Sequence, residues 1–203
     1  MKVLILFFAL LFVGIGSNAQ QHSYDFLVNA YCKAAQTIDL EKLDKQKVLA
    51  LNIDIGKEVR KLYADTIENI LHHIHKENDT LTQMEALTIF SKNYLYNIIY
   101  HCQTYLKINR KLIKSCPEET KSMQYITIKV NQYLSKHSEF TYKQVLDSAG
   151  YMGYIYGKEI PNQLQKDYDF DIVYPNILTE YLLHKSDLFL QAWLYYQSMR
   201  LFE

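Results

Sequence analysis

The sequence predicts an all-α fold, a single-domain bundle of about five to seven helices that includes one long central helix. Apolar residues recur at helical spacing along nearly the whole chain, and strand-like alternation is almost absent. Several Ser or Thr residues are followed three positions later by Glu or Gln. This pattern is typical of the capping box, in which side chains satisfy the free N–H groups of a first helical turn.

The first residues, MKVLILFFALLFVGIGSNAQ, have the pattern of a secretory signal peptide. One basic residue precedes an apolar run over Val3–Ile15, which is short for a bilayer span. Ser17 and Ala19 are the small residues expected before a cut. We therefore expect a signal peptide over residues 1–19, with cleavage before Gln20. An uncleaved membrane anchor is the alternative.

Residues 20–203 carry no linker, repeat or low-complexity tract, so we expect them to form a single all-helical domain that is periplasmic or secreted. The whole chain balances 22 Lys and Arg residues against 22 Asp and Glu residues. Such a balance offers no electrostatic footprint for nucleic acid or for an anionic membrane surface. We therefore expect no nucleic-acid partner. We also expect no membrane span once the signal peptide is cleaved.

Cys32, Cys102 and Cys116 are an odd number of cysteines for an exported chain. At most one intramolecular disulfide can form, and the sequence leaves open whether any pair does. No C-x-x-C motif is present, so a thioredoxin-like site or a zinc ribbon is not supported. Cys102 falls on an apolar helix face, where we expect a buried and inert thiol.

The first two helices are predicted from their apolar faces. The face of the first contains Phe26, Leu27, Ala30, Tyr31, Ala34 and Ile38. The face of the second contains Val59, Leu62, Tyr63, Ile67, Ile70, Leu71 and Ile74, and it follows a less regular, helix-compatible stretch over residues 39–52.

The long third helix is expected to begin near Thr80 or Thr82, because both residues fit a capping box. Its main apolar face contains Met84, Leu87, Ser91, Tyr94, Leu95, Ile98, Cys102, Tyr105 and Leu106. Ile89, Tyr96 and Tyr100 line up on the other side. A helix that is apolar on two sides is either held between neighbours or offers its second side to a partner.

The fourth helix is expected to open at Ser115-Cys116-Pro117-Glu118, and a fifth at Thr141 with Gln144 as its capping partner. A final helical run begins near Asn176 and bends at Ser186-Asp187. Within the fifth helix, a narrow stripe contains Leu146, Gly150, Gly153 and Gly157. A stripe without side chains favours close packing of another helix.

The stretch AGYMGYIYG over residues 149–157 does not have the spacing of a phosphate-binding loop, which requires G-x-x-x-x-G-K-[ST] or G-x-G-x-x-G after a strand. The string GYMGYIYG resembles the glycine–tyrosine element of small exported immunity proteins that neutralise cell-wall-degrading toxins. The resemblance covers eight residues and lacks the cysteines expected around them. It implies an inhibitor of an envelope enzyme.

Glu68, His72, His75 and Asp79 follow one another at helical spacing and are the weak candidate for a metal site, since imidazole and carboxylate groups could share zinc or copper. We favour the other interpretation, a solvated polar face that happens to contain histidines. We expect no metal and no cofactor.

Hydrolase motifs are absent, so the chain is not expected to be an enzyme. Neither G-x-S-x-G nor H-E-x-x-H occurs. The side chains of His101 and Cys102 diverge on a helix, and Glu180 with His184 fits a surface pair better than an acid–base pair.

The chain contains 18 tyrosines, which suit protein-binding surfaces because they offer large contact area and a polar tip. We therefore predict an exported, non-enzymatic helical protein that binds another protein in the cell envelope, as an inhibitor or immunity-like factor does. The predicted contact residues are Ile89, Tyr96, Tyr100, Tyr151 and Tyr154. The alternatives are a small-ligand or metal-binding envelope protein and, less favoured, a helical hydrolase.

Overall fold

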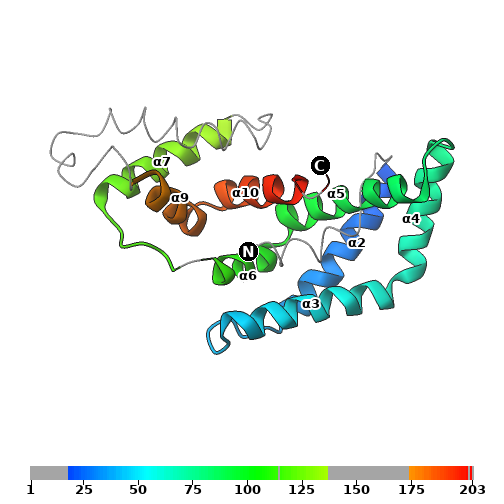
Figure 1. Cartoon of the computed structure of the whole chain (residues 1–203), viewed down its shortest axis with the longest axis horizontal. Helices are drawn as coiled ribbons and strands as arrows, with labels where there is room; N and C mark the ends of the chain where they lie inside the picture. The colour runs from blue at the N-terminus through cyan, green and yellow to red at the C-terminus, as the bar shows by residue number, and fades with distance from the viewer. Residues whose placement is uncertain (1–17, 114, 137–173, 201, 203) are drawn as a thin grey trace. The chain divides into compact units, whose positions relative to one another are not determined.

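The computed structural model describes residues 18–113, 115–136, 174–200 and 202. Over these residues the chain forms eight α-helices and no strand, which confirms the all-α class and shows that five to seven helices were too few. The helices belong to two compact units (Figure 1). The first holds α2 to α6 and the last residues of the chain, and the second holds α7, α9 and most of α10.

The first unit is arranged around α2, which contacts all four of the other helices. The bounds of its helices are α2 Asn18–Ala35, α3 Lys45–Leu62, α4 Ala64–Glu77, α5 Gln83–His101 and α6 Gln103–Leu112. The central helix of this unit is therefore α2, and not the third helix that the sequence favoured. In Figure 1, α2 runs from α5 towards α3.

The buried face of α2 explains why this helix is central. Leu27 and Tyr31 are buried as expected, and Tyr24 and Val28 complete the same face. Phe26, expected on that face, is 53% exposed instead. Its ring contacts the ring of Tyr63 edge-on, with the two centroids 5.1 Å apart. The prediction placed the apolar stripe of α2 slightly off the true one.

The helices α3 and α4 meet at one residue, Tyr63. Asp44 begins α3, because its side chain accepts a hydrogen bond from the backbone N–H of Lys47 at 2.8 Å. Tyr63 ends α3 and begins α4 with φ −119° and ψ 28°. The sequence predicted one helix across this point. Leu62, assigned to its apolar face, is 67% exposed at the end of α3.

The capping box at Thr82 begins α5 as predicted. The Thr82 hydroxyl accepts from the Glu85 N–H at 3.2 Å, and the Glu85 carboxylate accepts from the Thr82 N–H at 2.7 Å. The helix then ends at Cys102, whose backbone is extended at ψ 94°. The predicted long helix is therefore two helices, α5 and α6.

The second unit contains α7 Lys121–Lys136, α9 Tyr174–Lys185 and α10 Asp187–Met199, with α7 against α9. Residues 115–120 are not helical, so the expected start at Ser115 is wrong. The helix starts after Thr120, whose hydroxyl accepts from the N–H of Met123 at 3.2 Å.

The expected bend near Ser186 is present, because α9 ends directly before this residue and α10 begins directly after it. None of the helices in the described ranges is both long and apolar enough to cross a membrane.

Candidate partner-binding surface

The helix α5 carries its buried residues over more than one side. These buried residues are Ala86, Phe90, Ser91, Tyr94, Leu95, Asn97, Ile98 and Ile99. Within the described part of the chain, α2, α4 and α6 contact α5. This packing holds α5 firmly in the first unit, and one stripe of the helix is half-buried to exposed.

Ile89, Tyr96 and Tyr100 form that stripe, which we call the α5 aromatic surface. Tyr96 is 44% exposed, while Ile89 and Tyr100 are half-buried. The rings of Tyr96 and Tyr100 stack with their centroids 4.6 Å apart and a tilt of 34°. This geometry falls in the range of favourable aromatic pairs. The predicted residues on α5 therefore lie together, and Tyr96 reaches solvent.

A cation borders this surface. Lys92 lies one helical turn before Tyr96, and its Nζ is 5.7 Å from the centroid of the Phe202 ring. A lysine ammonium over an aromatic face is attracted by the ring quadrupole, whose face is partially negative. The contact places a residue from the end of the chain beside α5, which no local pattern could predict.

Five other tyrosines on the described helices belong to the core. Tyr24, Tyr31, Tyr94, Tyr105 and Tyr181 are all buried. Burial raises the pKa of Tyr105 to about 12 and raises the pKa of Tyr31 and Tyr94 as well, since a phenolate would lose its hydration. These hydroxyls therefore stay neutral.

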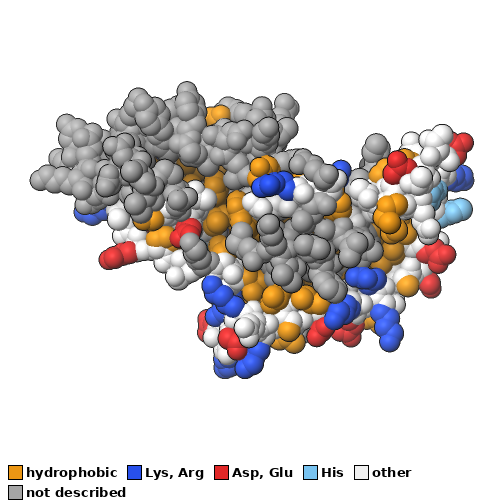
Figure 2. Space-filling view, viewed as in Figure 1, with side chains coloured by type: hydrophobic (Ala, Val, Ile, Leu, Met, Phe, Trp, Pro, Cys, Tyr) orange, Lys and Arg blue, Asp and Glu red, His pale blue; other side chains and the backbone are white. Residues whose placement is uncertain are grey.

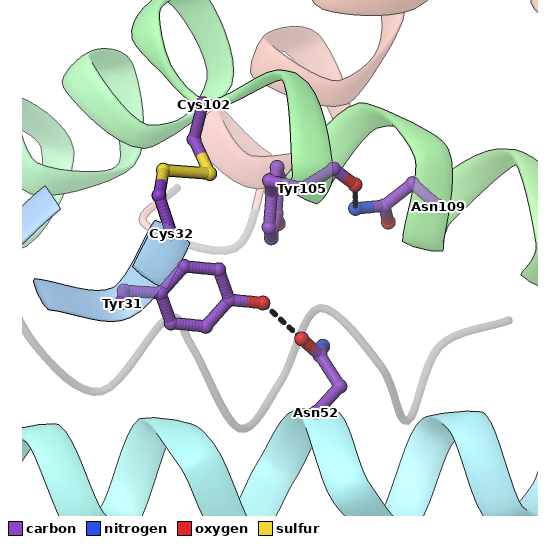
Figure 3. Close-up of a disulfide and its surroundings, with 6 residues drawn as sticks. All are labelled: Tyr31, Cys32, Asn52, Cys102, Tyr105 and Asn109. Carbon is purple, nitrogen blue, oxygen red and sulfur yellow. Dashed lines mark hydrogen bonds between the residues drawn. A yellow bond between two sulfur atoms is a disulfide. The ribbon is translucent and has the colours of Figure 1, made fainter. Parts of the chain in front are cut away.

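The core of the first unit also contains a buried polar contact between helices. The Tyr31 hydroxyl donates a hydrogen bond to Asn52 Oδ1 on α3, and its ring meets the ring of Tyr105 edge-on at 6.0 Å (Figure 3). Asn109 Nδ2 donates to the backbone carbonyl of Tyr105 at 2.8 Å. Tyr31 therefore ties α2 to both α3 and α6.

A disulfide joins Cys32 on α2 to Cys102 between α5 and α6, with the two Cα atoms 5.8 Å apart (Figure 3). Cys102 is buried as expected, but the expectation of a free thiol is wrong, because its sulfur is bonded to that of Cys32. Cys102 therefore cannot serve as a nucleophile while the bond is intact. Cys116 is the free cysteine, and it is exposed.

The structure separates one residue of the predicted histidine stripe from the other three. Glu68, His72 and His75 lie on α4, but α4 ends at Glu77, so Asp79 is beyond the helix. Over the part of the chain that the structure describes, no three His, Cys, Asp or Glu side chains gather as metal ligands. His72 is exposed, whereas His73 and His75 are half-buried. Histidine side chains, in pale blue, are visible on the face shown in Figure 2.

The remaining predicted site residues fall outside the described ranges. These are the contact residues Tyr151 and Tyr154 and the helix-packing residues Leu146, Gly150, Gly153 and Gly157. Glu180 and His184, considered for acid–base chemistry, both lie half-buried on α9.

A charged cluster in the second unit was missed by the sequence analysis. The Glu119 carboxylate accepts hydrogen bonds from the Tyr181 hydroxyl at 2.6 Å, from Lys185 Nζ at 2.9 Å, and from the Gln124 amide. These three donors, with that of Tyr181 the largest cause, lower the pKa of Glu119 to about 2. Glu119 and Tyr181 are 62 residues apart, so no local spacing signals the pair.

Comparison with known proteins identifies no similar protein. No family model matches the chain, and neither a curated protein nor a solved structure matches it. The function must therefore be argued from the chemistry of the described residues.

Proposed function

We propose that this chain is an exported, non-enzymatic protein that binds another protein of the cell envelope through the α5 aromatic surface. The observation that carries the proposal is the Tyr96–Tyr100 pair: two stacked rings on a firmly packed helix, with Tyr96 44% exposed. Tyrosine is among the residues that dominate binding energy at protein interfaces.

The stacking of Tyr96 on Tyr100 supports binding because it orders the rings before a partner arrives. Immobilising a side chain at an interface costs about 0.5–1.5 kcal/mol, so a ring that is already held loses less freedom on binding. The helix below is fixed by its buried residues, among them Phe90 and Ile98. Such a surface offers an anchor with little rearrangement.

The disulfide supports export. Such bonds form and persist in oxidising compartments, and Cys32–Cys102 would be unusual in a reducing cytosol. The Ser17-x-Ala19 pattern gives the expected cut before Gln20. The intact mass of exported protein tests this step, and a mass that retains residues 1–19 would replace the periplasmic assignment with an anchored one.

The binding surface is tested by replacing Tyr96 and Tyr100 together with serine. We expect capture of the partner to weaken while the helical circular dichroism stays nearly unchanged. The matched control is the Phe26→Ser, Tyr63→Ser variant, which removes another partly exposed aromatic pair of the first unit. If both variants weaken capture equally, the α5 aromatic surface is not the specific contact.

The partner itself can be sought with a photo-crosslinking amino acid at position 96 and, as the comparison, at position 26 of the full chain in its own host. The proposal expects one envelope protein that crosslinks from position 96 and not from position 26. Absence of any position-dependent crosslink, in a protein that folds normally, would count against protein binding and favour tests of small ligands.

A further inference from the structure

The two sulfurs of the disulfide lie in different surroundings. Cys32 is partly exposed on α2, and the residues one helical turn before and after it, Asn29 and Gln36, are exposed. Cys32 therefore belongs to a stripe of α2 that borders solvent. The polar side chains of Asn29 and Gln36 flank Cys32 on this stripe.

Cys102 has the opposite environment. It is 1% exposed, and Ile98 and Leu106, one turn before and after it, are fully buried. Tyr105 packs beside it and against Tyr31 (Figure 3). Cys102 therefore lies among core side chains.

The different exposure of Cys32 and Cys102 affects how the bond takes part in thiol–disulfide exchange. A thiolate attacks one sulfur of a disulfide from the side opposite to the other sulfur, and which sulfur is attacked depends on access. Attack on Cys102 Sγ requires approach through the core around Ile98 and Leu106. Attack on Cys32 Sγ requires approach from α2, whose stripe borders solvent.

We infer that Cys32 is the sulfur at which thiols open and close this disulfide. An incoming thiolate forms a new bond to Cys32 Sγ, and the Cys32–Cys102 bond breaks. The electron pair leaves with Cys102 Sγ, which takes up a proton from solvent or buffer. Closure is the reverse, in which the Cys102 thiolate attacks the mixed disulfide on Cys32 and releases the thiol. An oxidoreductase of the compartment would form its covalent intermediate with Cys32.

The test uses the oxidised full chain with Cys116→Ser, so that the exposed free thiol cannot react. The protein is treated briefly with a small monothiol such as glutathione under native conditions, quenched with acid, alkylated in denaturant and mapped by peptide mass. We expect the thiol adduct on Cys32 and the alkyl group on Cys102. The same reaction in denaturant should distribute the adduct over both cysteines.

A second variant blocks the approach. Asn29→Trp should slow the native exchange several-fold, whereas Ile128→Trp, at an exposed position in the second unit, should leave its rate unchanged. Three outcomes would overturn the inference: native adducts mainly on Cys102, a native distribution equal to the denatured one, or no native adduct when the denatured chain reacts.

Discussion

Loss of the Cys32–Cys102 disulfide should lower the stability of the first unit by a predictable amount. The two cysteines are 70 residues apart in sequence. In the chain-entropy description, a bond that closes a loop of this length removes disorder from the unfolded chain and stabilises the folded state by about 4 kcal/mol. For a protein of this size that corresponds to a fall in Tm of roughly 8–16 °C.

The assay compares the oxidised protein with the Cys32→Ala, Cys102→Ala variant in denaturant, following the circular dichroism of the helices. The variant also loses the sulfur of the buried Cys102, so the wild type measured with a reducing agent is a second arm in which packing is unchanged. Cys116→Ala, an exposed cysteine outside the bond, is the control and should unfold as the wild type does.

The fluorescence of Trp193, the single tryptophan, reports on the second unit, because Trp193 lies on α10 within that unit. Its transition shows whether the second unit responds to the lost bond. If reduced and oxidised wild type unfold at the same denaturant concentration, the loop-closure reasoning is wrong for this chain, and packing alone sets the stability of the first unit.

Three further perturbations test other contacts. Thr82→Ala should destabilise α5 by about 1 kcal/mol because it removes the cap, while Thr80→Ala, which lies before the helix, should change little in a thermal melt. Ser186→Ala should cost about 1–2 kcal/mol, seen in Trp193 fluorescence, because its hydroxyl accepts from the Phe189 N–H and donates to Asn131 Oδ1. The pKa of Glu119 is about 2 in the folded chain and ordinarily 4.5. The stability that its carboxylate contributes is therefore complete above pH 4.5 and is lost as the pH falls towards 2. Glu119→Gln should make the free energy of unfolding depend less on pH between these values.

The parts of the fold that local chemistry determines could be predicted from the sequence. The side chains of Thr82 and Glu85 each accept a hydrogen bond from the other residue's backbone N–H, so their spacing alone predicts the start of α5. The apolar periodicity likewise predicts the helical character of the described ranges. On α5, the second apolar stripe of Ile89, Tyr96 and Tyr100 could be found because its members repeat at helical spacing.

The helix breaks could not be predicted, because they depend on distant parts of the chain. Neither Tyr63 nor Cys102 is a glycine or proline, and apolar periodicity continues across both. At Cys102 the chain turns where α2, α5 and α6 meet and where the sulfur reaches Cys32. The choice of Cys32 as the partner of Cys102 was equally open, since three pairings of three cysteines fit the sequence.

The junction at Tyr63 limits how this protein can change in length. One residue both ends α3 and begins α4, with no loop to absorb a change. Inserting or deleting a single residue there would turn α4 by about 100° about its own axis. Ile70 and Ile74, the buried residues of α4, would then leave the core. Related chains should therefore keep their length at this junction and vary it in the non-helical stretch over residues 115–118, where added residues need not rotate a helix.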